Sequence, residues 1–407
     1  LSSIKVVGGY VTVDDADKDY GDVTVTVSGS KAGISTETLT VGTRTDYGFE
    51  LQALEGPTQI FAGRSPLTVD GDTNDLDEDD FKTAKFRFTE TTPDTWLKSR
   101  KLEFTVPDGV KIIGADFDKV KYFGSTGVGD FEENTDITSN GSSLRIKALD
   151  SFGTIEDDEN SYIDLALYIT AEASFSGEVN VTASGAGLDA DTLTPVHVAD
   201  VVSPVIIESA ATETNMGYQA VDTADIVITE AAAGALMENE YVVGKMDTVY
   251  GDQELGFASD DAELVVDGEV TVKDFKVTSG EMKFKVDGES YSSPSTITLK
   301  NVKVGTTRSI PYGSYDLLVG GSALVNNYDE DASQKATAKT DGDLTPSSLA
   351  ALNEDFGVFD TDEGFKFKGY LTVKTETGTL DGKVSVTIGS NIMNLDGTEI
   401  EMDVAPY

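Results

Sequence analysis

The sequence contains no cysteine, a single histidine, His197, and a single tryptophan, Trp96. Without cysteine it can form no disulfide, no thiolate metal site and no cysteine nucleophile. One histidine is too few for a histidine-based metal site, and it leaves His197 as the single candidate base for Ser-His-acid catalysis. His197 lies in an alternating strand pattern near a domain end, so we interpret it as a surface or edge residue. The chain also lacks a phosphate-binding loop and a dinucleotide fingerprint. We therefore expect no enzymatic activity.

Basic residues and long apolar runs are also scarce. The chain has 30 Lys and Arg against 73 Asp and Glu, which gives a formal net charge of −43. This field repels phosphate, so neither nucleic acid nor an anionic membrane is an expected partner. No apolar run reaches the roughly 18 residues that a membrane span needs. The sequence begins at Leu1 without a basic and apolar leader. We interpret it as a secreted, cell-surface protein whose signal peptide has been removed.

Strand and turn signals fill most of the chain. Apolar and polar residues alternate over residues 23–27, 85–89, 282–285 and 384–388, which is the pattern of half-buried antiparallel strands. Asp-Gly and Asn-Gly pairs separate many of these segments and favour tight hairpin turns. Helical periodicity is scarce. The predicted class is therefore all-β, with tandem antiparallel, Ig-like β-sandwich domains and a β-hairpin segment at each end.

Three short motifs recur in the same order at nearly constant spacing. Residues 88–90 return at 228–230, residues 144–147 at 282–285, and residues 177–181 at 313–317. Such spacing indicates two copies of a unit of about 140 residues, a size that suits a β-sandwich.

A second match joins the two ends of the chain. Residues 9–13 and 21–27 resemble residues 369–373 and 382–388. Two strands alone are marginally stable in water, so either hairpin could be a fragment without a domain of its own. We divide the chain into a donor hairpin (1–41), a first sandwich (42–203), a second sandwich (204–345) and a C-terminal β segment (346–407).

The end of the chain resembles a known module. Residues 388–407, which finish in Met-Asp-Val-Ala-Pro-Tyr, are similar to the opening of the copper amine oxidase N-terminal-like stalk domain of secreted clostridial-type surface proteins. Residues 224–236 resemble, more loosely, the repeats that precede this module. The resemblance implies an extracellular surface protein. It implies no copper chemistry, because the chain has no cluster of histidines.

Acidic loops are the candidate metal sites. One loop, residues 70–80, places side-chain oxygens at alternate positions as a Ca²⁺ loop does, but it lacks the glycine and the final glutamate of an EF-hand. A second loop, residues 15–22, has aspartate at alternate positions. The candidate ligands are Asp70, Asp72, Asn74, Asp75, Asp77, Asp15, Asp17 and Asp19. Residues 155–160 and 326–331 are weaker candidates. A generally acidic surface, adapted to salt or to solubility, is the alternative interpretation.

Two alternatives concern ligands of another kind. Trp96 could be a platform for sugar stacking, but its position just before a strand favours a core or rim anchor. A carbohydrate-binding role would also need Tyr122 and Tyr291 on an exposed face. Carboxylate pairs suited to glycoside hydrolysis carry no information here, because 73 acidic residues make accidental pairs inevitable.

The repeats, the matched terminal hairpins and the missing catalytic set lead to one functional prediction. We expect a self-assembling extracellular protein, a filament or surface-layer subunit, whose partners are copies of itself. A cell-surface adhesin or carbohydrate-binding stalk, with cell-wall glycan as partner, is the alternative. Donor-strand complementation would join the subunits, with Ile4, Val6, Val11 and Val13 as the donated apolar side chains. The competing arrangement has residues 1–41 folded back onto their own first sandwich.

Overall fold

The computed structural model of the chain describes residues 21–29, 35–44, 48–65, 78–93, 96, 101–121, 135–138, 141–146, 160–185, 193–215, 217, 220–247, 254–259, 261–307, 309–327, 359 and 364–374. Within them the chain is all-β, and one 3-10 helix, η1 (Glu78–Phe81), is the single helical element. The predicted all-β class is therefore confirmed, and the C-terminal hairpin segment that was also predicted lies partly outside the described residues. In this described part no helix has the length and apolar character needed to cross a membrane.

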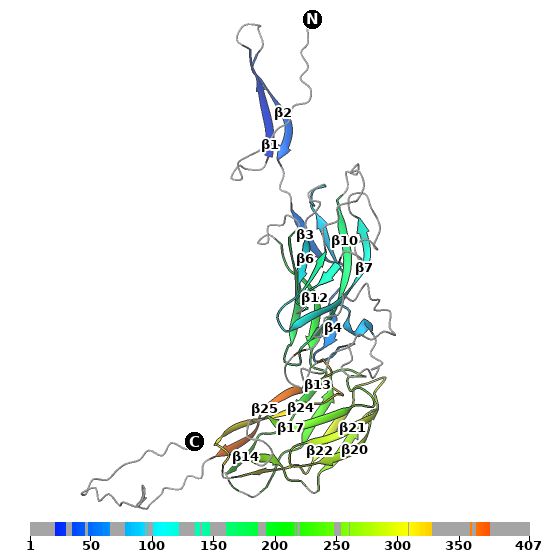
Figure 1. Cartoon of the computed structure of the whole chain (residues 1–407), viewed down its shortest axis with the longest axis vertical. Coiled ribbons are helices and arrows are strands. Elements are labelled where there is room, and N and C mark those ends of the chain that lie inside the picture. The colour runs from blue at the N-terminus through cyan, green and yellow to red at the C-terminus, as the bar shows by residue number, and fades with distance from the viewer. Residues whose placement is uncertain are drawn as a thin grey trace, which may run out of the picture.

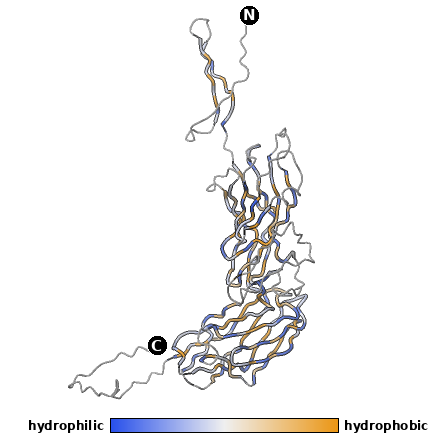
Figure 2. The backbone as a smooth tube through the Cα atoms, viewed as in Figure 1, coloured by the Kyte–Doolittle hydropathy of each residue, from blue (hydrophilic) through white to orange (hydrophobic). Residues whose placement is uncertain are grey.

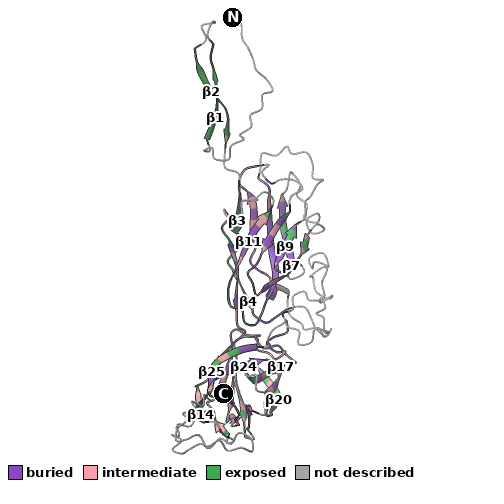
Figure 3. Ribbon diagram, turned by 60° about the vertical axis from the view of Figure 1, so that its left-hand side comes forward, coloured by how far each residue is buried: buried purple, intermediate pink, exposed green. Residues whose placement is uncertain are grey.

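The first element is an antiparallel hairpin of β1 (Gly21–Val27) and β2 (Glu37–Arg44). Alternating Thr and Val residues give both strands high β propensity. Figure 1 shows the hairpin beyond the end of the first sandwich, and Figure 3 shows it coloured as exposed along most of its length. Only Val23 and Arg44 among its strand residues are partly covered. The described hairpin therefore does not fold back onto the first sandwich.

The first sandwich packs a four-stranded sheet against a six-stranded sheet. The four-stranded sheet has the order β3 (Phe49–Ala53), β5 (Phe86–Glu90), β10 (Tyr162–Ala171), β7 (Val110–Lys121). The six-stranded sheet has the order β4 (Thr58–Phe61), β12 (Val196–Val202), β11 (Gly177–Gly185), β6 (Leu102–Thr105), β9 (Ser143–Ile146), β8 (Thr135–Ile137).

The second sandwich is built in the same way, with one small additional sheet. Its four-stranded sheet has the order β13 (Val205–Glu208), β16 (Ile226–Glu230), β22 (Thr296–Lys300), β19 (Glu263–Asp267). Its six-stranded sheet has the order β14 (Thr212–Asn215), β25 (Gly364–Lys374), β24 (Gly313–Gly320), β17 (Tyr241–Asp247), β21 (Met282–Gly288), β20 (Thr271–Val277). The additional sheet has the order β15 (Val221–Asp222), β23 (Lys303–Thr306), β18 (Leu255–Phe257).

The two sandwiches share one topology. The four-stranded sheets of the two sandwiches correspond strand for strand, in both their spatial order and their order along the chain. The six-stranded sheets correspond in the same way. Even the unusual parallel pair recurs, since β4 runs parallel to β12 and β14 runs parallel to β25. The three sequence motifs fall on the equivalent strands β5 and β16, β9 and β21, and β11 and β24. The structure therefore confirms the tandem arrangement that the motif spacing predicted.

The position of β25 differs from the division made on sequence. Residues 364–374 were assigned to a separate C-terminal segment, but β25 pairs with β24 and β14 inside the second sandwich. The matched residues 369–373 are therefore the end of a sandwich-closing strand, the counterpart of β12. At the other end of the chain, β2 continues to Arg44, past the boundary placed at residue 41. The alternating pattern identified these strands but could not say which sheet each one joins.

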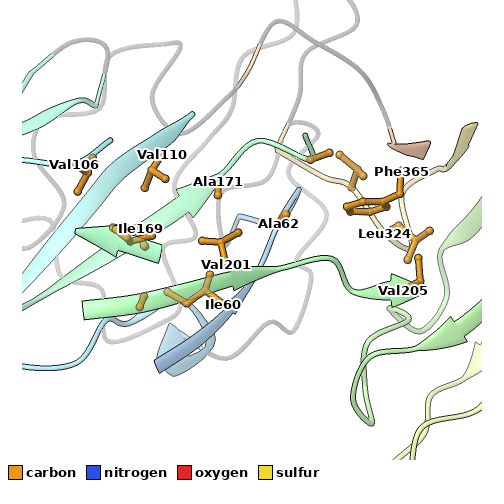
Figure 4. Close-up of a cluster of buried hydrophobic side chains, with 14 of the residues drawn as sticks. Ile60, Ala62, Val106, Val110, Ile169, Ala171, Val201, Val205, Leu324 and Phe365 are labelled. Atoms are coloured by element: carbon orange, nitrogen blue, oxygen red, sulfur yellow. The ribbon is translucent and has the colours of Figure 1, made fainter. Parts of the chain in front are cut away.

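The core follows from the same alternation. Inward residues of β5, β6 and β11 are buried while their neighbours in sequence are less buried. In β5, for example, Phe86 and Phe88 are buried and Arg87 is not. The central strand β10 is buried on both faces from Ile163 onward. Figure 2 shows the corresponding alternation of apolar and polar colour along the strands. Buried apolar residues of the two sandwiches belong to one continuous cluster. Figure 4 shows buried side chains on both sides of the junction, with Ile60, Ala62 and Val201 in the first sandwich and Val205, Leu324 and Phe365 in the second.

Candidate functional site: the junction, two buried glutamates and the free hairpin

The predicted calcium ligands and the predicted donor residues lie outside the described residues. This holds for Asp70, Asp72, Asn74, Asp75, Asp77, Asp15, Asp17 and Asp19, and equally for Ile4, Val6, Val11 and Val13. Within the described ranges, no group of three or more His, Asp or Glu residues is placed to hold a metal ion. The calcium prediction therefore keeps its sequence basis.

Trp96 is a core residue. It is 3% exposed and packs edge-on against Phe88, at 5.1 Å between ring centroids, and against Phe49, at 6.3 Å. Such T-shaped contacts are favoured by the charge distribution of aromatic rings. A buried indole cannot stack on a sugar, so the expectation of a core anchor is correct and the carbohydrate platform is wrong for this residue. Tyr291 is exposed, and Tyr122 lies outside the described residues.

His197 is a satisfied strand residue. It lies in β12, half-buried, and its Nε2 is 3.0 Å from Asp200 Oδ1 and 3.1 Å from the Ala199 carbonyl oxygen. Both partners are on the same strand, so the imidazole makes only local contacts along β12 among the hydrogen bonds described. This agrees with the interpretation of His197 as an edge or surface residue.

Two buried glutamates occupy equivalent positions at the ends of β5 and β16. The carboxylate of Glu90, which is fully buried, accepts hydrogen bonds from the backbone N–H groups of Trp96 (2.8 Å) and Ser161 (2.6 Å). Glu230, 2% exposed, accepts the N–H groups of Leu236 (3.1 Å) and Ser295 (2.8 Å). In each sandwich one N–H belongs to the residue six positions after the glutamate. The other belongs to the residue just before the neighbouring strand, which is β10 in the first sandwich and β22 in the second.

These glutamates tie loops to strands. A buried carboxylate is costly unless its oxygens are hydrogen-bonded, and here backbone N–H groups satisfy it. Glu230 also accepts the Ser290 hydroxyl at 2.7 Å. The sequence marked both positions, because residues 88–90 and 228–230 were the first repeat motif, but it gave no sign of their role. The signal that could have revealed this role is the alternation itself, because each glutamate occupies the next inward-facing position after the buried apolar residues of its strand.

The junction between the sandwiches begins at Gly63, just after β4. Its φ of +79° lies in the left-handed region, which favours glycine. A Cβ at this position would lie 3.0 Å from Val325 Cγ2 of the second sandwich and 3.4 Å from Ala173 Cβ of the first. Glycine therefore allows the two sandwiches to approach at the backbone. The Gly63 carbonyl accepts the N–H groups of Asn326 (2.8 Å) and Asn327 (3.3 Å).

Two asparagine side chains complete the junction. The Asn326 amide pairs with the Ser65 backbone in both directions, accepting at 2.8 Å and donating at 2.9 Å. Asn327, which is 1% exposed, donates to Thr170 Oγ1 and to the Ala171 carbonyl oxygen, both at 2.7 Å. Side-chain amides that mimic a strand pairing are strong and directional because both donors and acceptors are used. These hydrogen bonds therefore fix the position of the second sandwich against the end of the first.

Arg64 crosses the same junction. Its side chain is buried, its Nη2 donates to the Ala235 carbonyl oxygen of the second sandwich, and its guanidinium lies 5.0 Å from the Phe61 ring centroid. Burial lowers the pKa of Arg64 to about 10, although the charges of Asp80, Glu230 and Glu289 act in the opposite direction. The guanidinium therefore stays protonated at neutral pH and bridges the two sandwiches.

The free hairpin carries an apolar face. Pairing places Val25 opposite Leu39, with Thr24 opposite Thr40 and Thr26 opposite Thr38 on the other side. Four of the nine large hydrophobic residues that are exposed in the described part belong to this hairpin. They are Val25, Val27, Leu39 and Val41. A two-stranded sheet with one apolar face has no core of its own.

In the described part of the second sandwich, one edge of β25 is paired along only part of its length. β14 pairs with residues 371–374 of β25, and β24 occupies the other side of β25. Among the described residues, no strand pairs with residues 364–370 on the β14 side. An unpaired row of backbone groups is a template for strand addition.

Comparison with known proteins is limited to solved structures. No known protein family matches the chain, and no curated protein matches it. The Streptococcus agalactiae AgI/II polypeptide BspA C-terminal domain has a TM-score of 0.25 and 10% identity, covering 68% of this chain and 96% of that one. The collagen adhesin CNA from S. aureus has a TM-score of 0.21 and 9% identity, with coverages of 81% and 91%. BcpA, the major pilin subunit of Bacillus cereus, has a TM-score of 0.26 and 10% identity, with coverages of 87% and 77%. At such TM-scores these likenesses establish neither the function nor the partners of this chain.

Proposed function

We propose that the chain is an extracellular structural protein that assembles head to tail with copies of itself, into a filament or a surface layer. The observation that carries the proposal is the match between residues 9–13 and residues 369–373. In β25 the second set closes a sandwich, since Tyr370, Leu371 and Val373 are all buried. The N-terminal segment therefore has the side-chain pattern of a sandwich-closing strand.

The glycine at the start of each segment supports the same proposal. Gly369 has a φ of +71°, and its N–H donates to Asp316 Oδ1 at 2.7 Å. Gly9 precedes Tyr10 just as Gly369 precedes Tyr370, so the two segments share the residue that this left-handed position favours in β25. Strand donation supplies direction through backbone hydrogen bonds and specificity through alternate side chains.

The acceptor that we favour is the open edge of β25. The exposed side chains of residues 364–370 include Lys368 and also Lys366, whose Nζ lies 3.0 Å from Asp247 Oδ2 in the same sandwich. Lys368 is therefore the basic side chain of this edge on which the acceptor proposal rests. The donor segment is followed by an acidic loop with Asp15, Asp17 and Asp19. Opposite charges at the two partners favour the encounter and fix the register.

The junction within one chain supports a head-to-tail geometry. It joins the end of one sandwich to the opposite end of an equivalent sandwich, which is a heterologous contact. Contacts of this type, when repeated between molecules, produce open polymers unless the rotation between copies closes a ring. The resemblance of residues 388–407 to a stalk module of secreted surface proteins supports the extracellular address. The alternative of a carbohydrate-binding adhesin is weakened by the burial of Trp96.

Deleting residues 1–13 tests the proposal. We expect the truncated chain to stay folded, because both described sandwiches begin after residue 47, and to remain monomeric where the full chain assembles. Sedimentation velocity at matched concentrations measures both. A peptide of residues 1–13 should in addition stop the growth of polymers of the full chain. Assembly of the truncated chain equal to that of the full chain would rule out this donor and direct attention to residues 382–407.

Calcium is expected to raise the melting temperature. Each bound ion removes two units of the negative charge and fixes an acidic loop, and binding to the folded state alone adds about 2.7 kcal/mol per site when calcium is a hundredfold above Kd. Differential scanning calorimetry with calcium and with chelator measures the shift. Replacing Asp70 and Asp72 with alanine should remove more of it than replacing Glu156 and Asp157. A melting temperature that does not respond to chelator would contradict the calcium prediction and leave the acidic residues as a solvating surface.

A further inference from the structure

The exposed face of the β1–β2 hairpin needs a covering partner. It consists of Val23, Val25 and Val27 of β1 with Leu39 and Val41 of β2. The opposite face is polar, where Thr26 and Thr38 lie with their hydroxyls 3.3 Å apart. An exposed apolar face on a protein with this acidic surface marks an interaction site. Figure 2 shows the apolar colour along both hairpin strands, away from the sandwich cores.

The sequence contains one segment with the same pattern and the same spacing. Residues 21–27 match residues 382–388, and residues 37–43 match residues 398–404 at the same offset of 361. The apolar positions coincide, and the C-terminal set is Val384, Val386, Ile388, Ile400 and Met402. Residues 382–404 lie outside the described residues, and their pattern predicts a second hairpin with one apolar face.

The strand directions place the two segments at opposite ends of the described body. β3 begins at Phe49 beside Glu90, whereas the junction lies at the other end of the first sandwich, where β10 ends at Ala171. In the second sandwich, β25 begins at Gly364 beside Gly320, on the junction side, and ends at Lys374 on the outer side. The hairpin and the C-terminal segment therefore follow from the outer ends of a two-sandwich body, which are the ends that would meet in the proposed head-to-tail assembly.

We propose that the apolar face of the β1–β2 hairpin is covered by residues 382–404 of a second copy of this chain. Two like hairpins packed face to face form a small four-stranded sandwich, which buries both apolar faces and leaves the threonine face in water. The contact is heterologous, because it joins the N-terminal segment of one copy to the C-terminal segment of the next. It rests on the proposed self-assembly and adds a second surface to it, separate from the donated residues 1–13.

Cysteine pairs in the full chain test this contact, since the natural sequence has no cysteine. One chain carries Val25→Cys and the other Val386→Cys, and the two are mixed and treated with a short bis-maleimide. We expect a covalent species of twice the 43.2 kDa chain mass that contains one chain of each kind. The matched control is Thr26→Cys mixed with Thr387→Cys, which places the thiols on the outward faces and should give no such species.

Three results would overturn the proposal. Cross-linking of Val25→Cys chains alone, to the same extent as in the mixture, would mean that the hairpin pairs with its own copy. Cross-linking within a single chain that carries both substitutions, without dimers, would mean that the C-terminal segment folds back. No cross-link in a sample that assembles by sedimentation would reject this surface while leaving self-assembly intact. Absence of both assembly and cross-link would instead reject the proposed function from which the contact follows.

Discussion

Replacing Glu230 with alanine is expected to lower the free energy of unfolding by about 3 kcal/mol, because the buried N–H groups that it accepts would lose their partners. The Leu236 and Ser295 N–H groups and the Ser290 hydroxyl all point at this carboxylate. Backbone donors cannot move away without breaking the ends of their strands. Chemical denaturation monitored by circular dichroism measures the loss.

Two variants make the measurement specific. Glu90→Ala removes the equivalent carboxylate of the first sandwich and should cost a similar amount, since two backbone N–H groups depend on it. Glu238→Ala changes an exposed glutamate of the same loop region and should change stability by no more than about 0.5 kcal/mol. If Glu230→Ala were as stable as Glu238→Ala, the carboxylate would not be the element that holds the loop.

Replacing both Asn326 and Asn327 with alanine is expected to uncouple the two sandwiches. The double variant loses four side-chain hydrogen bonds across the junction, each of which contributes about 0.5–1.5 kcal/mol. The continuous core, Arg64 and the backbone hydrogen bonds to the Gly63 carbonyl would then hold the contact. We expect a single thermal transition in the natural chain and two separated transitions in the variant, by differential scanning calorimetry.

Asn215→Ala is the matched control for the junction, because Asn215 is exposed at the end of β14. It should leave the single transition in place. Small-angle X-ray scattering of the same samples should show a broader distribution of distances in the double variant alone. An unchanged single transition in the double variant would mean that the remaining contacts, which are the apolar core, Arg64 and the backbone hydrogen bonds to Gly63, are sufficient and that the asparagine side chains are dispensable.

The sequence predicted the class and the repeat well, for a physical reason. Alternation of period two reports which side of a strand is buried, and motifs at constant spacing report a duplicated unit. Phe86, Phe88 and Glu90 are the example, since their counterparts in the second sandwich are found at the same places in β16. The prediction of a core role for Trp96 followed from its position before a strand.

The junction and the location of β25 could not be predicted in this way. Ser65 and Asn326 are 261 residues apart, and nothing in either local sequence identifies the other. Gly63 reads as a turn glycine, although its function is to let two backbones approach. The alternation in residues 369–373 predicts a strand equally well in a terminal hairpin and in a sandwich, because sheet membership depends on partners that the pattern does not contain.

Negative-stain electron microscopy of the purified full chain, with calcium and with chelator, tests the central claim of self-assembly most directly. Calcium is expected to favour ordered polymers, filaments or sheets, whose repeat corresponds to the two-sandwich body with its terminal hairpins. Chelator should shorten or dissolve them. Separate, monomeric rods under both conditions, at concentrations where sedimentation also finds a single 43.2 kDa species, would contradict the account.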